Sequence, residues 1–449
     1  MRSSLICPKL AMSMLSICSV LSASDALAQS TPALPVISSV IPLEVVIPSW
    51  VETPTEARPW FDQYSWQAFI ALNWPADPTN PGVPLAPNNP TTFQNVSAGT
   101  PTVWESYATS YRLFGSGDDA PPAFGTGPAE GNPCSSGAKS LRMVSKGTDV
   151  ANDVIGDVNE AFSHPLIDQN LNYVFAEVRF NDVFYDFVRS NQYYLKKNLS
   201  EAPQPLQMPS SDPSTNAIGA MMVKAAWRQM TAEDDQSRYH VIVADVVDPD
   251  GGGCSLKPMG LVGLHIAQKV ENFPEWIWSS FEQVDNVQLG PNASTNTKIS
   301  FNNGTDTPAT PRGWANRPKL APPLEVMSKR LATQVTRLNQ IPTTPEGQST
   351  VDQNASYTAL LAGTPFEHYQ LVITQWPADA ATFILPEDGG IYPQDAGGAF
   401  PANGATNTAM ETYMQSQEDA QGAGGNSCMS CHYGSATSDF SWILFNKSH

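Results

Sequence analysis

The stretch MMVKAAWRQM, residues 221–230, decides the fold class, because its side chains alternate in character along the chain. Apolar side chains stand at positions 221, 223, 225 and 227, whereas Lys224 and Arg228 fall on the opposite side. A period of two residues is typical of a β-strand with one face against the core. The stretch therefore predicts a strand, and its neighbours indicate the kind of sheet to which it belongs.

Five further segments are rich in β-branched and aromatic residues and are bounded by Gly, Pro, Asn or Asp, as strands usually are. They are NYVFAEVRF (172–180), RYHVIVADVV (238–247), GLVGLHIAQKV (260–270), EWIWSSFEQV (275–284) and HYQLVITQWP (368–377). Several strands follow one another without a helical pattern between them. The sequence therefore predicts a mainly β (α+β) protein, with a large antiparallel sheet or sandwich, a few packed helices and long Pro/Gly-rich loops.

Two segments have helical periodicity. In WFDQYSWQAFIALNWP (60–75), apolar side chains recur at helical spacing and also fill a second face, which predicts a buried helix that ends before Pro75. A similar stripe predicts a second helix over Pro323–Asn339. The segment Ala76–Gly137 is dense in Pro, Gly, Asn and Thr, so we expect it to be mostly loop.

The N-terminus has the features of a secretory signal peptide. A weakly basic start precedes an apolar run over Leu10–Leu21 and the small-x-small triplet Ala26-Leu27-Ala28. The apolar run is too short for a permanent membrane anchor, and no later segment resembles a span. We therefore expect cleavage after Ala28 and a periplasmic or secreted protein.

The charge balance of the chain is strongly acidic. It contains 24 Lys and Arg against 43 Asp and Glu, a formal net charge of −19. Nucleic-acid binding requires clustered basic side chains to neutralise phosphates. The composition therefore argues against a nucleic-acid partner, and it is compatible with an exported protein that meets a basic partner.

The motif that carries chemistry is SCMSCH (427–432), in which Cys428, Cys431 and His432 form the pattern C-x-x-C-H. This pattern attaches haem c: the two thiols add across the vinyl groups of the porphyrin, and the adjacent imidazole binds the iron. With six Cys and six His in 449 positions, chance gives only roughly 0.001 such patterns. The motif and the export signal together predict one covalently attached haem c.

Other uses of the motif fit the sequence less well. A zinc site usually needs a second paired Cys or His element, and the sequence contains no second C-x-x-C and no His-x₃₋₅-His. A thioredoxin-like dithiol lies between a strand and a helix, whereas this motif lies among Gly and Ser near the end of the chain. A disulfide within the motif would be strained. The remaining exported pair, Cys134 and Cys254, predicts a disulfide, with two buried thiols as the alternative.

A sixth iron ligand has to come from upstream or from the terminal residue, since no Met follows Met429 and only residues 433–449 follow the motif. His265 is the first candidate, because the small neighbours Gly263 and Ala267 leave room for a flat ring. The alternative role for that residue is a core histidine. Weaker candidates are Met410 and Met414, whose alternative role is packing, and then His368 and His240. The last candidate is His449, a chain end that we expect to be disordered. A five-coordinate iron, with no sixth ligand, is also open.

Segments throughout the chain resemble a group of exported proteobacterial proteins labelled cytochrome c family proteins. The similar segments are QAFIALNWP, VKAAWR, MGLVGLHIAQK, WIWSSFEQVDN, YQLVITQWP, NTAMETYMQ, SCMSCH and DFSWIL, between Trp60 and Leu444. The resemblance implies haem binding through Cys428, Cys431 and His432, with electron transfer, and it implies no substrate. One departure is Gln283, where such proteins often carry His after Phe-Glu.

These observations divide the chain into a signal peptide (1–28), an extended N-terminal arm (29–57), a mainly β body (58–405) and a haem-attachment segment packed on the body (406–449). The apolar tail SDFSWILF (438–445) would shield the haem or dock the C-terminus. We expect a periplasmic monohaem c-type protein that exchanges single electrons with a redox protein or a small molecule. The alternatives are a peroxidase-like or dehydrogenase-like haem enzyme with its substrate site in the body, and a haem-bearing sensor or binding module.

Overall fold

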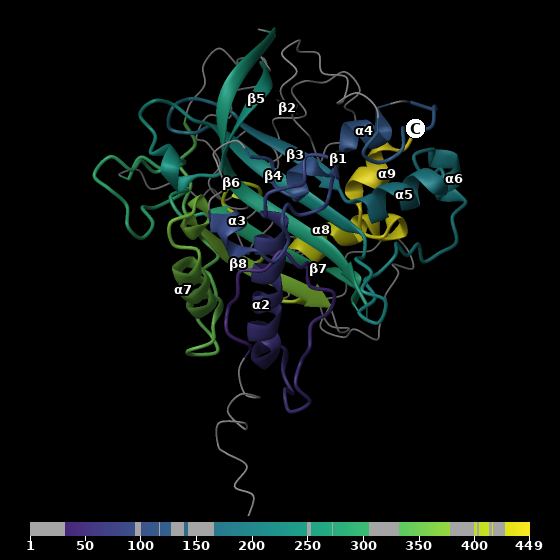
Figure 1. Cartoon of the computed structure of the whole chain (residues 1–449), viewed down its shortest axis with the longest axis horizontal. Helices are drawn as coiled ribbons and strands as arrows, with labels where there is room; N and C mark the ends of the chain where they lie inside the picture. Colours follow the sequence, from purple (N-terminus) through teal and green to yellow (C-terminus); the bar gives the residue numbers. More distant parts are fainter. Residues whose placement is uncertain are drawn as a thin grey trace, which may run out of the picture.

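A computed structural model describes residues 32–94, 100–115, 117–126, 139–141, 166–248, 253–271, 273–304, 332–377, 399–401, 404–412, 415 and 427–449. The described strands form a nine-stranded sheet in the order β1-β3-β4-β6-β7-β8-β9, with β5 paired to β6 and β2 paired to β5 (Figure 1). Their pairings are antiparallel except for that of β2 with β5. The predicted antiparallel sheet with few helices is therefore confirmed.

Strands β3 to β8 overlap the six predicted segments, although β6 begins seven residues earlier than predicted, and β1, β2 and β9 were not predicted. The strand bounds are β1 Ala108–Thr109, β2 Lys139–Leu141, β3 Val174–Phe180, β4 Met221–Gln229, β5 Val241–Asp248, β6 Gly253–Val270, β7 Phe273–Gln283, β8 Tyr369–Pro377 and β9 Ala399–Phe400. The register of β4, β6 and β7 aligns their side chains in rows that cross the centre of the sheet, and two neighbouring rows matter for the site. One row is Lys224, His265 and Ser280, and the next is Met222, Ala267 and Trp278.

The helices are short apart from two. Their bounds are α2 Pro54–Leu72, α3 Pro90–Gln94, α4 Ser110–Phe114, α5 Asp182–Ser190, α6 Lys196–Ser200, α7 Thr350–Leu360, α8 Cys428–His432 and α9 Trp442–Lys447. A capping box of Thr53 and Glu56, with Pro54 in the first turn, starts α2. The extended arm therefore ends at Thr53, and its predicted end at residue 57 was wrong, because the capping signal lies upstream of the apolar pattern.

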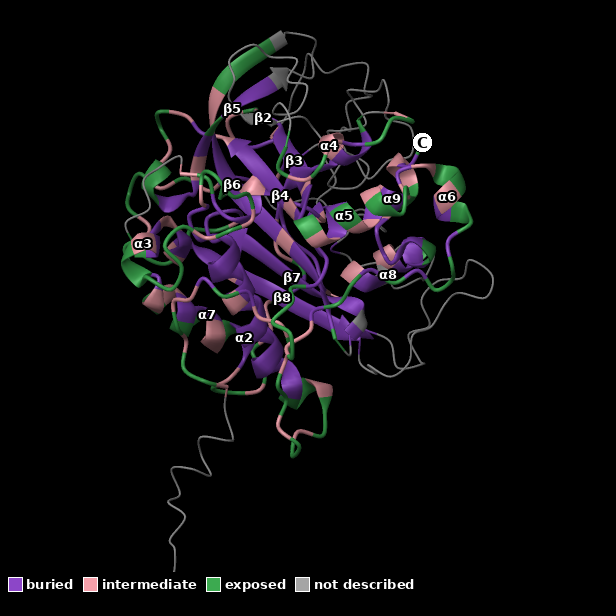
Figure 2. Cartoon of the chain, turned by 45° about the vertical axis from the view of Figure 1, so that its right-hand side comes forward, coloured by how far each residue is buried: buried purple, intermediate pink, exposed green. Residues whose placement is uncertain are grey.

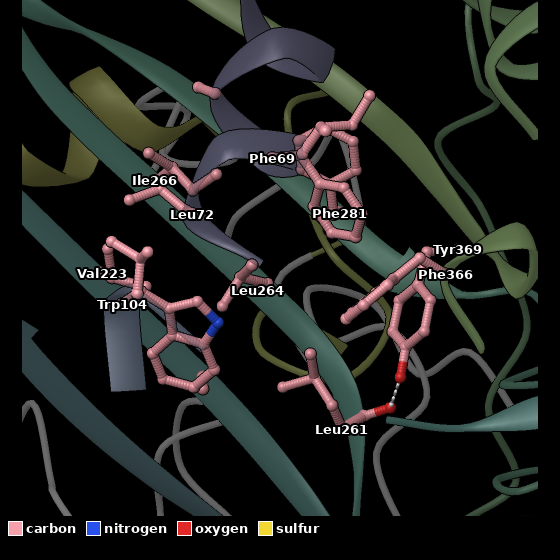
Figure 3. Packing of buried hydrophobic residues seen from close by; sticks show 14 of the residues in the cluster. Phe69, Leu72, Trp104, Val223, Leu261, Leu264, Ile266, Phe281, Phe366 and Tyr369 are labelled. Carbon is pink, nitrogen blue, oxygen red and sulfur yellow. Dashed lines mark hydrogen bonds between the residues drawn. The ribbon is translucent and has the colours of Figure 1, made fainter. Parts of the chain in front are cut away.

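One side of the sheet, which we call the α2 face, is covered by α2 and α7 and holds a large apolar cluster beside a buried polar group of Asp62, Ser65, Ser279 and Thr374. Phe69 stacks on Phe281 at 4.4 Å between ring centroids, and Trp66 stacks on Tyr357 at 5.0 Å. Figure 3 shows Phe69 and Leu72 of α2 beside Ile266 of β6 and Phe281 of β7, and Figure 1 shows α2 crossing in front of the strands. The prediction of a helix buried nearly all round is confirmed for α2.

The opposite side, the C-terminal face, carries Met222, Ala267 and Trp278 of the sheet. The apolar cluster on this face also includes residues from α5, α8, the 3₁₀ turn η7 (Tyr433–Ser438) and α9. The buried strands and the partly exposed α8 and α9 are seen together in Figure 2. The end of the chain thus packs on the sheet, since it cannot bury its own apolar side chains alone.

The predicted helix over Pro323–Asn339 is wrong for the part that the structure describes. Residues 332–339 form neither helix nor strand. Val335 is buried, and its backbone N–H donates to Phe301 O at 2.7 Å while its carbonyl accepts from Asn302 Nδ2 at 2.9 Å. Because a neighbouring loop satisfies this backbone, the apolar spacing of the segment does not need a helix.

Several predictions fall outside the described residues. They concern the signal peptide over residues 1–28, the first half of the helix just discussed, Cys134 and Met414. The proposed Cys134–Cys254 disulfide therefore stays a prediction. Among the helices that the structure describes, none combines the length and apolar character needed to cross a membrane.

Candidate haem-attachment site

The motif C-x-x-C-H forms a single short helix, α8, on the C-terminal face. Residues three and four apart share a helix side, so Cys428, Cys431 and His432 project from the same side of this turn. The turn closes with Cys431 N–H donating to Ser427 O at 3.2 Å. It is fixed to β8 by Met429 N–H, which donates to Gln375 Oε1 at 2.7 Å. The local sequence therefore gathers the three groups, and the sheet fixes their position.

A hydrogen bond to the backbone orients the ring of His432. Its Nδ1 lies 2.7 Å from the carbonyl oxygen of Phe440. A carbonyl only accepts, so Nδ1 carries the proton, and in the neutral imidazole Nε2 then carries the lone pair. The ring lies 4.4 Å from the ring of Trp278 on β7, at an interplanar angle of 45°. The half-buried imidazole is thus in the tautomer that a metal ligand needs.

The two thiols lie in a half-buried, largely apolar setting. Cys428 packs with Val372 and Ile373 of β8 and with Ala405, and its Sγ lies 3.9 Å from Ala405 O. Cys431 is also half-buried, and its carbonyl accepts from Trp442 Nε1 at 3.0 Å. Neither cysteine is part of a disulfide. These are chemically plausible positions for thiols that react with a flat apolar group.

The tail after the motif is folded against it. Trp442 lies so close to Gly434 that a Cβ at Gly434 would come within 2.7 Å of its ring, which explains glycine at that position. Phe440 and Leu444 are fully buried, whereas Phe445 is 42% exposed. The predicted docking of this tail onto the body is therefore confirmed, and its role as a haem shield stays a prediction.

The sequence analysis missed a buried ion pair beneath the motif. Lys269 Nζ at the end of β6 donates to Asp439 Oδ1 at 2.7 Å, and both side chains are at most 1% exposed. Burial raises the pKa of Asp439 and lowers the pKa of Lys269, because each charged form loses hydration. No local pattern joins the two residues, which are 170 positions apart, so only the fold reveals the pair.

Among the candidate sixth ligands, His265 shares the C-terminal face with the motif. Its Nε2 lies 3.3 Å from Glu411 Oε2, and the side chain is 18% exposed. The predicted room above Gly263 is taken, because a Cβ there would lie 3.2 Å from Met410 Cε and 3.3 Å from Asn407 Oδ1. The small neighbour of His265 therefore accommodates the chain segment 407–410.

Met410 is 1% exposed and belongs to an apolar cluster that includes Val262, Phe301 and Val335, apart from the cluster that holds Met429. This position fits packing, the alternative role considered for it.

The other histidines lie elsewhere. His240 is on the α2 face, where its Nε2 lies 3.0 Å from Glu105 Oε2 and its ring stacks on Phe366. His368 ends a 3₁₀ turn before β8, 3.2 Å from Glu367, and burial lowers its pKa. Both precede strands rather than lying within them. The sheet separates His240 from the motif.

The expectation of a disordered terminal residue was wrong. His449 N–H donates to Tyr194 O at 2.8 Å, and its carbonyl accepts from Lys196 N–H at 2.5 Å. Its ring Nε2 lies 2.5 Å from Phe114 O and therefore donates to that carbonyl. The loop before α6 and α4 thus hold the end of the chain, which makes His449 a structural residue in this arrangement.

Gln283, the position where the resembling proteins often carry His, lies in a different polar network. Its Nε2 donates to Asp285 Oδ2 at 3.0 Å, and Asp285 pairs with Arg238 at 2.7 Å. Five residues of extended strand separate it from Trp278, a span of about 17 Å. The departure at Gln283 therefore does not alter the surroundings of His432.

In the described part of the chain, no set of three or more His, Cys, Asp and Glu side chains is arranged to hold a metal ion. Haem c does not require such a set, because the thiols bond to the porphyrin periphery and only the imidazole reaches the iron. No family model, no curated protein and no solved structure matches this chain. The site is therefore the source of information about its function.

Proposed function

We propose that the protein is a periplasmic c-type haem protein that transfers single electrons. Cys428 and Cys431 would hold one haem through thioether bonds, and His432 would bind the iron through Nε2. One observation carries the proposal: the motif lies on one helical turn with the imidazole already in the required tautomer, through the 2.7 Å bond from Nδ1 to Phe440 O. The side chains around the motif fit a flat, apolar group.

The described residues would hold the group, orient its ligand and exclude water. The buried side chains of Met429, Tyr433, Phe440 and Leu444 would keep water from one side of the attachment helix. When bound, haem supplies a one-electron Fe(III)/Fe(II) couple, whose potential depends on the axial ligand, burial and hydrogen bonding. The partial exposure of Cys431 and His432 would leave an edge for a redox protein or a small-molecule donor or acceptor.

Covalent attachment is the first test. The full chain, exported together with haem-maturation machinery, is expected to keep a Soret band after acid–acetone extraction and to begin at Gln29. Cys428→Ser and Cys431→Ser each remove one thioether, and the double variant should release all haem. Ser430→Ala is the matched control, because it changes the motif and leaves both thiols and His432 in place. Full extraction of haem from the unaltered protein would refute the proposal.

The role of the iron is the second test. We expect the reduced protein to bind carbon monoxide slowly or not at all, as an electron carrier with a sixth ligand does. Rapid binding would mean an open iron, which would favour a haem enzyme or a sensor over a shuttle. Repeating the measurement with His265→Ala asks whether the imidazole on the C-terminal face is that ligand, since its removal should then open the iron.

A further inference from the structure

The turn that ends η7 has an unusual backbone. Asp439 has φ 50° and ψ 51°, and the next residue, Phe440, has φ 62°. A non-glycine residue in the left-handed region is strained, and a bulky aromatic residue adopts this conformation less readily than Asp or Asn. Two such residues in succession persist only where the surrounding structure holds them.

The side chain of Asp439 makes the contacts that hold this turn. Its Oδ1 accepts from Lys269 Nζ at 2.7 Å and from Trp276 Nε1 at 3.1 Å, and its Oδ2 accepts from Met208 N–H at 2.7 Å. Glu275 also favours the charged form of Lys269. One buried carboxylate therefore ties the turn to β6, to β7 and to the segment before β4.

The turn delivers one group to the motif. Phe440 follows Asp439 directly, and its carbonyl oxygen is the acceptor for His432 Nδ1 at 2.7 Å. Groups that hydrogen-bond to a metal-binding histidine fix its tautomer and raise its basicity. The chain of contacts therefore runs from Lys269 to Asp439, to the Phe440 carbonyl and to the imidazole.

Stability alone does not account for the ion pair. Replacing a buried ion pair by apolar side chains of similar size is often neutral or stabilising, because both ions lose hydration. The Lys269–Asp439 pair also fixes the geometry of a turn, which suggests a role other than stability. We propose that Lys269 and Asp439 are positioning residues for His432, which hold the Phe440 carbonyl against Nδ1 and so set the electron donation of the imidazole to the iron. This inference rests on the proposed haem attachment.

The test compares three forms of the exported, haem-loaded full chain. Lys269→Met with Asp439→Asn removes both charges and keeps a polar side chain that tolerates the left-handed turn. Lys269→Met with Asp439→Gly removes the anchor as well, while glycine still permits the backbone. The expected result is a midpoint potential that shifts to more positive values in the order unaltered, Asn variant, Gly variant, since a looser bond at Nδ1 makes the imidazole a weaker donor.

The matched control is Arg238→Met with Asp285→Asn, a second buried ion pair that does not touch the turn. It should lower stability comparably and leave the potential unchanged. A second readout is hydrogen exchange of the His432 Nδ1 proton by NMR of the reduced protein, expected to be faster in the Gly variant.

An unchanged potential and exchange rate in both turn variants overturn the inference, as does an equal shift in the control. If the Gly variant does not fold, the Asn variant alone decides, and no shift there overturns the inference. An unaltered protein without covalent haem would instead refute the proposed function itself.

Discussion

The two faces of the central sheet are covered in different ways. On the α2 face, Trp66, Phe69 and Phe281 belong to one continuous buried apolar cluster. On the C-terminal face, the strands also present Lys224 and His265, and the covering segment contains the motif rather than a long helix. Buried apolar packing stabilises the fold, and polar groups buried on either face must be hydrogen-bonded or paired. Substitutions on the α2 face should therefore change mainly the free energy of unfolding, whereas substitutions beside the motif should also change the spectrum and potential of the proposed haem.

The largest effect on stability is expected for Trp66→Ala on the α2 face. Trp66 is fully buried against the rings of Phe69, Phe281 and Tyr357, and its Nε1 donates to Asn354 Oδ1 at 3.1 Å. Truncating a buried Trp costs about 3–5 kcal/mol through lost burial and the cavity left behind. Denaturant unfolding measures the loss, and the folded fraction should keep covalently bound haem. A loss below about 1 kcal/mol would contradict the assignment of this face as the main core.

Asp62→Asn on the same face should change the pH dependence of stability. Asp62 accepts from Thr350 Oγ1 at 2.6 Å and from Thr374 Oγ1 at 2.7 Å, and burial raises its pKa to about 6. The folded state therefore binds a proton more readily than the unfolded state, so this group's contribution is full below about pH 4 and is lost as the pH rises through about 6. The loss amounts to at most about 3 kcal/mol.

The asparagine variant carries no titrating group there. Unfolding curves at several pH values between about 4 and 7 should show a smaller decline in stability than the unaltered protein shows. Parallel curves for both proteins would mean that Asp62 is ionised throughout this range in the folded state.

Trp278→Phe tests the C-terminal face. The ring packs against His432, and its Nε1 donates to Glu275 O at 2.9 Å, so its loss should cost about 1–2 kcal/mol of stability. In contrast to Trp66→Ala, this change should alter the haem absorption spectrum and the midpoint potential, because it changes the ring that packs against His432, the proposed iron ligand. Spectroelectrochemical titration measures both. An unaltered spectrum would place the chemistry away from this contact.

Met410→Leu is expected to have the smallest effect. The side chain is buried in an apolar cluster, and exchange for a side chain of similar volume usually costs less than about 1.5 kcal/mol. The iron spectrum should stay the same, since this methionine serves packing. A changed spectrum with preserved stability would show that Met410 reaches the iron and would revise the packing role.

Strand β4 was predictable because side chains alternate between the two faces of a sheet, which gives residues 221–230 a period of two, although the structure buries both faces of this strand. The predicted helix over Pro323–Asn339 failed where it is described, because its apolar spacing did not reveal that Phe301 and Asn302 satisfy the backbone around Val335. The prediction that His449 is disordered failed for a related reason. The sequence does not show which distant segments will hydrogen-bond to a chain end.

The sequence by itself determined which groups the motif carries, since two thiols and an imidazole within five residues share one side wherever the segment forms a helical turn. Only the tertiary structure decided what the imidazole faces. The Phe440 carbonyl and the Trp278 ring contact His432, and the Lys269–Asp439 pair ties the turn that carries Phe440 to β6. Such contacts depend on the packing of distant segments, and packing leaves no fixed spacing in the sequence.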